Sequence, residues 1–256
     1  MINLRGTRGD GSVTLSQNGT PVHGLFNSQS SFATHVLTKE RYATRLPDSV
    51  PLELAGTLGC GIPTGAGSVL NVLKPQPGST VAVFGLGAVG LAAVAAAKLS
   101  GCSRIVGVDL NRGRFDLARE FGATDVMDAG SGNVIGAIHE LIPGGVDGAI
   151  EASGAKQALT EAFMSTKLTG TTVLVGAAPI GTQYEIDSVC LLAGRTLRGC
   201  TMGLANPRVF IPQLVRMWEQ GLLPIERMSK TFKLNDIEGA FAAAVGGSVV
   251  KPVLIP

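Results

Sequence analysis

Three closely spaced glycines followed by an aspartate form the motif in this sequence with the most specific chemistry. Gly85-Leu86-Gly87-Ala88-Val89-Gly90 separates an apolar run from a helix-like segment, and Asp109 follows Gly90 by 19 residues. In a strand–turn–helix unit, the first glycine permits a tight turn, the second lets the backbone approach a pyrophosphate, and the third lets the helix pack on the strand. Free N–H groups at the helix start favour the anion. Because Asp109 is placed to accept hydrogen bonds from an adenosine ribose, the motif predicts a dinucleotide site.

The carboxylate of Asp109 also favours one dinucleotide over the other, because it would repel the 2′-phosphate of NADP. The sequence therefore predicts NAD as the cofactor. Arg112 and Arg114 follow shortly afterwards and could neutralise a phosphate, so NADP stays open as an alternative. Both arginines also suit the solvated start of a helix.

The segments around this motif alternate in the manner of a parallel α/β sheet. Short β-branched runs predict strands at Thr80–Phe84, Arg104–Val108, Thr124–Met127, Asp147–Glu151, Thr171–Val175 and Thr196–Gly199. The segments between them predict helices at Ala88–Leu99, Arg112–Phe121, Asn133–Leu141 and Lys156–Lys167. This order predicts a parallel sheet covered on both faces, and six strands fit the doubly wound nucleotide-binding (Rossmann) sheet, whose ligand lies at the carboxyl ends of the strands. We therefore expect an α/β dinucleotide-binding domain at residues 64–206.

The two ends of the chain do not continue this alternation. Residues 1–63 are rich in turns and alternating segments, which predicts an incomplete β-rich domain. After residue 206, the sequence predicts helices at Arg208–Gln220 and Asn235–Val245 and a closing strand at Lys251–Ile255. Because residues 1–63 are too few to close a core of their own, we expect residues 207–256 to return to the domain that they begin.

The composition is that of an ordinary globular protein, with 256 residues, 45% apolar side chains and a net charge of +2. Because basic runs are absent, neither nucleic acid nor an anionic membrane is expected as a partner. The apolar stretch at 81–97 is long enough to suggest a membrane span, but glycines interrupt it at the spacing of a strand-to-helix turn. The four cysteines form no Cys-x-x-Cys pair and the N-terminus has no signal-peptide core, so we expect a cytoplasmic protein.

Two carboxylates, Asp147 and Glu151, stand at the ends of one expected strand. Four residues along a strand separate them by about 13 Å, which is too far for paired acid–base work. We therefore expect both to have structural roles.

Several longer motifs carry a resemblance to a known family. They are 58–65 (LGCGIPTG), 77–91 (PGSTVAVFGLGAVGL), 107–109 (GVD), 144–147 (GGVD) and 194–199 (GRTLRG). Together they resemble the zinc-dependent medium-chain alcohol dehydrogenases over almost the whole chain, and 28–33 (SQSSFA) is most similar to the aryl (benzyl) alcohol dehydrogenases. The resemblance implies a Rossmann domain beside a GroES-like catalytic domain. It also implies hydride transfer between NAD and a primary or secondary alcohol bound to a catalytic zinc.

The resemblance assigns roles residue by residue. Cys60 matches a ligand of the catalytic zinc, and Thr64 matches the residue that packs against the nicotinamide. The cofactor fingerprint is matched by Gly85, Leu86, Gly87, Ala88, Val89, Gly90 and Asp109, with Arg114 beside the ribose, Val175 and Ala177 at the carboxamide, and Lys251 near the pyrophosphate. Arg195 and the strand after it match the segment through which subunits pair, so a homodimer or homotetramer acting on a small alcohol or aldehyde is implied.

The zinc site, in contrast, is incomplete in this sequence. The family's other zinc ligands, a Cys and the His of a Gly-His-Glu segment, lie in the N-terminal catalytic domain, of which the resemblance covers only the final stretch. His23, His35 and His139 stand in no such motif. A catalytic zinc needs three protein ligands and an open position. The sequence therefore leaves two hypotheses, an NAD-dependent alcohol oxidoreductase and a catalytically inactive NAD-binding module.

Overall fold

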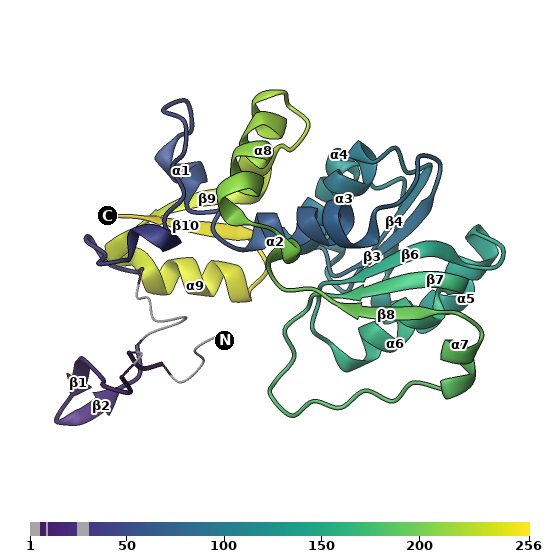
Figure 1. Cartoon of the computed structure of the whole chain (residues 1–256), viewed down its shortest axis with the longest axis horizontal. Coiled ribbons are helices and arrows are strands. Elements are labelled where there is room, and N and C mark those ends of the chain that lie inside the picture. The colour runs from purple at the N-terminus through teal and green to yellow at the C-terminus, as the bar shows by residue number, and fades with distance from the viewer. Residues whose placement is uncertain (1–5, 9, 25–30) are drawn as a thin grey trace.

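The computed structural model describes residues 6–8, 10–24 and 31–256, and its centre is a six-stranded parallel sheet (Figure 1). The strand order is β5-β4-β3-β6-β7-β8. The strands are β3 (Thr80–Phe84), β4 (Arg104–Asp109), β5 (Asp125–Asp128), β6 (Val146–Glu151), β7 (Thr166–Leu174) and β8 (Thr196–Gly199). The order reverses between β3 and β6, so the predicted doubly wound sheet is confirmed, and its switch point lies at the carboxyl ends of these two strands.

Helices on both faces of the sheet follow the strands closely. They are α3 (Ala88–Leu99), η3 (Arg112–Arg114) with α4 (Phe115–Phe121), η4 (Ala129–Ser131), α5 (Val134–Leu141) and α6 (Lys156–Met164). The expected helix to Lys167 was too long, because the Ser165 carbonyl accepts a hydrogen bond from Val146 N–H and Thr166 pairs with Val146 in the sheet. The apolar stretch at 81–97 divides between β3 and α3. In the part of the chain that the structure describes, no helix is long and apolar enough to cross a membrane.

A helical segment that the sequence did not predict leads into the sheet. It comprises α1 (Leu52–Ala55), α2 (Gly61–Gly67) and the π-helical turn η2 (Ser68–Leu73). Small residues let α2 lie against α3, since a Cβ added at Gly65 would meet the Val89 carbonyl oxygen at 1.9 Å. Every residue of α2 is buried, so the segment lacks the polar face that makes a helix recognisable in sequence.

The remaining elements lie outside the sheet. They are β1 (Leu15–Gln17), β2 (Thr20–Val22), η1 (Glu40–Tyr42), α7 (Ser188–Leu192), η5 (Met202–Leu204), α8 (Pro207–Glu219), η6 (Ile225–Met228), β9 (Ser229–Lys233), η7 (Leu234–Asp236), α9 (Ile237–Val245) and β10 (Lys251–Ile255). Figure 1 shows α1 on the same side of the molecule as α8, β9 and β10. Hydrogen bonds join the two ends, because Ser49 donates to Glu219 and Arg208 donates to the Glu40 carbonyl.

This arrangement brings segments from both ends of the chain together. Within 1–63, the described strands are β1 and β2 alone, so the β-rich character expected there is limited to one antiparallel hairpin. The domain bounds 1–63, 64–206 and 207–256 remain a prediction.

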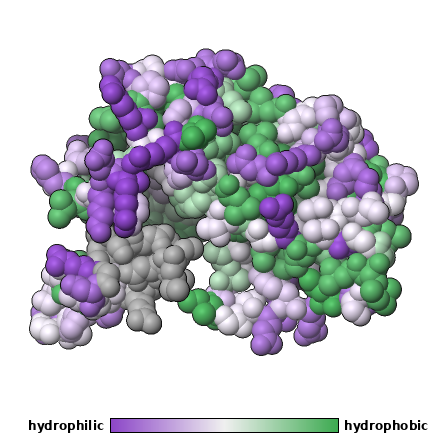
Figure 2. Space-filling view, viewed as in Figure 1, coloured by the Kyte–Doolittle hydropathy of each residue, from purple (hydrophilic) through white to green (hydrophobic). Residues whose placement is uncertain are grey.

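Hydrophobic surface gathers over the region where α7 lies (Figure 2). Val189, Leu191 and Leu192 of α7 are exposed, Leu192 to 86%. Beside them in the sequence, β8 forms one edge of the sheet and carries no strand on its outer side among the described residues. A contiguous apolar surface next to an open strand edge is a typical association surface.

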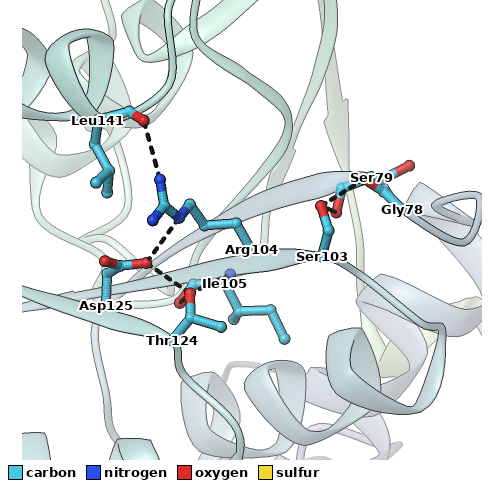
Figure 3. A network of polar contacts seen from close by, with 8 residues as sticks. All are labelled: Gly78, Ser79, Ser103, Arg104, Ile105, Thr124, Asp125 and Leu141. Atoms are coloured by element: carbon cyan, nitrogen blue, oxygen red, sulfur yellow. Dashed lines mark hydrogen bonds and ion pairs between the residues drawn. The ribbon is translucent and has the colours of Figure 1, made fainter.

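A network of polar contacts holds the amino edge of the sheet (Figure 3). The Arg104 guanidinium lies 3.1 Å from the Asp125 carboxylate and donates to the Leu141 carbonyl. Thr124 donates to the same carboxylate at 2.6 Å. These contacts fix where β4 and β5 begin, and thereby the register that brings their carboxyl ends together.

Candidate functional site

The predicted glycine turn joins β3 to α3 at the carboxyl edge of the sheet. Gly85 has φ of +90°, and a Cβ there would lie 2.8 Å from the Ser153 nitrogen. A Cβ on Gly90 would lie 1.7 Å from the Gly85 carbonyl oxygen. Leu86 N–H donates to the Asp109 carboxylate at 2.6 Å. The turn is therefore closed on itself by its glycines and tied to the end of β4 by Asp109.

A cavity of about 320 Å³ opens beside this turn, within the size range of small-molecule sites. Gly85, Gly87, Asp109 and Arg114 all line it. Residues that the sequence did not single out complete the wall from β5, β6 and α6, and include Ala129, Ala152, Ser153, Gln157 and Glu161. The indication of these residues in the sequence is their position alone. Each follows β5 or β6, whose carboxyl ends lie beside those of β4 and β3.

Asp109 and Arg114 form the polar end of this cavity. One Asp109 oxygen accepts from Leu86 N–H and lies 3.4 Å from the Arg114 guanidinium, and the other accepts from Asn111 N–H at 2.7 Å. The Arg114 Nε is buried without a hydrogen-bond partner in the protein. A buried donor without a partner indicates an acceptor that a ligand would bring.

Glu151 holds the loops that follow β6 and β7. Its Oε1 accepts from the Ser153 N–H, the Ser153 hydroxyl and the Gly154 N–H at 2.8, 2.6 and 2.8 Å. Its main-chain carbonyl accepts from Val175 N–H and Gly176 N–H, both at 2.9 Å. The side chain is fully buried and Oε2 has no partner. The structural role expected for Glu151 thus serves the site, since one residue positions both loops.

A strained turn lies against Thr64. Met202 and Leu204 have φ of +52° and +46° around Gly203, a left-handed run that costs about 1–3 kcal/mol per non-glycine residue. Thr64 Oγ1 lies 3.8 Å from Met202 Sδ, and Asn71 donates to the Gly203 carbonyl at 3.0 Å. Backbone strain of this kind is often found at ligand sites. In the sequence, Gly203 is the single residue that indicates such a turn.

The other predicted residues do not line the cavity. Leu86 is buried and packs towards Gly107, while Ala88, Val89 and Gly90 form the first turn of α3. Val175 and Ala177 follow β7, with the Ala177 backbone packed on Gly154. Lys251 begins β10 and is not part of the cavity wall.

Cys60 stands alone as a candidate zinc ligand. It is exposed and immediately precedes α2. Across the described ranges, no three or more His, Cys, Asp or Glu side chains gather closely enough to hold a metal ion. These residues do not fit a three-ligand catalytic zinc site, and we assign no chemical step to zinc.

Comparisons with known proteins agree with this geometry. A family model described as zinc-binding dehydrogenase matches residues 88–219. Geraniol dehydrogenase from Castellaniella defragrans is 36% identical over 250 residues, which cover 97% of this chain and 67% of that protein. The chain thus spans about two thirds of the length of this relative.

Two solved structures bear on the site. Benzyl alcohol dehydrogenase from Acinetobacter calcoaceticus superposes with a TM-score of 0.90 at 37% identity, covering 97% of this chain and 68% of that one. A zinc-binding dehydrogenase from Sinorhizobium meliloti bound to NADP gives a TM-score of 0.73 at 27% identity, covering 82% and 61%. A structure of similar fold has therefore been solved with a dinucleotide bound.

The role of Glu151 can be tested by removing its carboxylate. Glu151→Ala removes the acceptor of three part-buried hydrogen bonds, and we expect the free energy of unfolding to fall by about 1.5–3 kcal/mol. Glu238→Ala, an exposed glutamate on α9, is the control and should change it by about 0.5 kcal/mol or less. Urea unfolding measures both. Equal midpoints for the two variants would show that the Glu151 side chain does not hold the loop at 153–154.

Proposed function

The chain belongs to the zinc-binding dehydrogenase family, as its resemblance to medium-chain alcohol dehydrogenases predicted, and on this basis we propose that it takes part in hydride transfer between NAD and an alcohol or aldehyde. The observation that carries the proposal is the position of Asp109. Its carboxylate joins the glycine turn to the end of β4 inside the cavity at the switch point of the sheet. A nicotinamide dinucleotide bound there would supply the two-electron acceptor for alcohol oxidation.

The residues of the cavity fit such a dinucleotide. Gly87 begins α3, whose free N–H groups and dipole favour a pyrophosphate. Asp109 Oδ1 retains a lone pair for a ribose hydroxyl, and the unpartnered Nε of Arg114 is a donor at the same end. Gly85 allows the tight turn and Gly90 allows the start of α3 to pack on it. These features support binding of the adenosine and pyrophosphate parts.

We extend the proposal to the nicotinamide end of the site. Thr64 would pack against the ring, and the backbone at Val175 and Ala177 would meet its carboxamide. Support comes from Glu151, which fixes the loop at 175–176, and from the strained turn beside Thr64. Lys251 is the proposed basic residue near the pyrophosphate, although it lies outside the cavity wall and would act from β10.

An aryl or other primary alcohol is the proposed substrate. The names of a relative and of a similar structure, geraniol dehydrogenase and benzyl alcohol dehydrogenase, describe those proteins and support this class here. In the 28–33 segment on which the sequence based this prediction, residues 28–30 lie outside the described residues.

An NAD-binding module without turnover is the second candidate function. The observation in its favour is the single candidate zinc ligand, Cys60, among the described residues. Family membership does not decide between the two, because this chain spans about two thirds of the length of its relative.

The ribose role of Asp109 predicts a loss of nucleotide affinity on substitution. Asp109→Asn removes a charged acceptor, whose hydrogen bonds contribute about 1.5–3 kcal/mol, so the Kd for NADH should rise about 10- to 100-fold. Asp116→Asn is the control, because that carboxylate is exposed and pairs only with Arg119. Enhancement of NADH fluorescence measures both variants. Equal Kd values would place the ribose elsewhere.

Zinc content and turnover separate the two candidate functions. The purified chain is titrated with NADH, its zinc is determined by atomic emission, and benzyl alcohol is offered together with NAD. About one zinc per chain with formation of NADH would support the oxidoreductase and contradict the module. Binding of NADH with little zinc and no turnover would support the module.

We also propose that two copies associate through β8 and α7. Arg195, which precedes β8, donates to the Thr166 carbonyl at 2.9 Å and so holds the strand edge in place. Leu192→Asp puts a charge into the apolar surface and should shift the chain towards monomers in light scattering. Val245→Asp on α9, where the valine is 87% exposed, should leave the mass unchanged. A monomeric wild-type chain would contradict the proposal.

A further inference from the structure

We propose that Asp128, at the end of β5, helps to select NAD over NADP by holding the guanidinium of Arg112 away from the ribose end of the cavity. The inference rests on the proposed function, because it concerns the same nucleotide site. The sequence left NADP open because Arg112 and Arg114 could neutralise a 2′-phosphate. A structure of similar fold is bound to NADP, so the fold alone does not make this choice.

The sheet register places the two acids side by side. β4 and β5 run parallel, and Asp109 pairs with Asp128 at their carboxyl ends. The Arg112 Nε donates to Asp128 Oδ2 at 2.7 Å, and the Arg112 Nη2 lies 2.6 Å from the same oxygen. The other Asp128 oxygen accepts from Gly130 N–H at 2.8 Å. Asp128 is therefore fixed by the backbone and holds Arg112 through two nitrogen atoms.

The neighbours of Arg112 show how near the ribose site it lies. Leu110 and Arg114 line the cavity on either side of it in the sequence, and Ala129, which follows Asp128, lines it as well. Arg112 itself is not part of the wall, and its side chain is 75% exposed. Since Asp128 is the partner that the structure gives this side chain, removing Asp128 would leave a mobile guanidinium at the rim of the cavity.

The charge balance at the ribose end of the cavity depends on Asp128. Arg114 is paired with Asp109 and Arg112 with Asp128, so these four side chains carry no net charge. The Gly130 N–H and the Arg112 guanidinium keep the pKa of Asp128 below its ordinary value, so this carboxylate stays ionised at neutral pH. Removal of its charge would leave one uncompensated cation, which favours a phosphate dianion on the ribose.

The test compares NADPH with NADH on the full chain. Asp128→Asn keeps an oxygen that can accept from Gly130 N–H but loses the charge that holds Arg112. We expect the ratio Kd(NADPH)/Kd(NADH) to fall about tenfold, as one charge-assisted contact to the phosphate forms. The Kd for NADH itself should change less than twofold. Fluorescence titration at fixed ionic strength measures both constants.

Two further variants show whether the effect runs through Arg112. Asp128→Asn combined with Arg112→Gln should restore the wild-type ratio, and a ratio that stays low in this double variant would overturn the positioning role. Asp116→Asn is the matched control, because it breaks an exposed Arg–Asp pair on α4, with Arg119, and neither residue lines the cavity. Its ratio should equal that of the wild type.

The outcomes distinguish this inference from the proposed function. A wild-type chain that binds neither NADH nor NADPH would overturn the proposed function and this inference with it. A wild-type chain that binds NADH, together with an unchanged ratio in Asp128→Asn, would overturn this inference alone.

Discussion

The hydrogen bond from Leu86 N–H to the Asp109 carboxylate is the contact on which the site depends. It links the turn after β3 to the end of β4, two points that are adjacent only because the strands are parallel and in register. Without it, a glycine-rich turn would have many alternative conformations, since glycine loses more backbone entropy on ordering than any other residue. With it, the backbone that faces the cavity has one geometry, and the carboxylate that would receive a ribose is already oriented.

The two edges of the sheet are polar for different reasons. At the amino edge, Arg104 finds its acceptors within the protein, and the contacts fix where strands start. At the carboxyl edge, Arg114 and Glu151 each retain a buried polar atom without a partner, and they are the only charged side chains of the described residues to do so. Buried polar groups without partners are rare in folded proteins. The Arg114 Nε belongs to a residue that lines the cavity, so a ligand bound there would supply its acceptor.

The sequence predicted the parts of this fold that have local signals. The strands β3 to β8 and the helix α3 follow from apolar runs separated by turns, and the fingerprint at Gly85 and Asp109 has fixed spacing. The helix α2 was not predicted, because it is buried on every side and rich in glycine. The turn at Met202–Leu204 was not predicted either, since its left-handed backbone is imposed by packing on Thr64 and Gly67 rather than by its own side chains.

The ion pair between Arg112 and Asp128 shows most clearly what sequence alone leaves out. From sequence alone, Arg112 is a cation that could neutralise a phosphate or suit the solvated start of a helix, and the nearby Asp109 and Asp116 do not reveal its partner. Its partner, Asp128, is 16 residues away in the sequence and lies close to it because β4 pairs with β5. The net charge that a phosphate would meet is therefore a property of strand register. In this chain, the role proposed for Asp128 makes cofactor preference depend on the end of β5 as well as on Asp109, because Asp128 decides whether Arg112 is available to a phosphate.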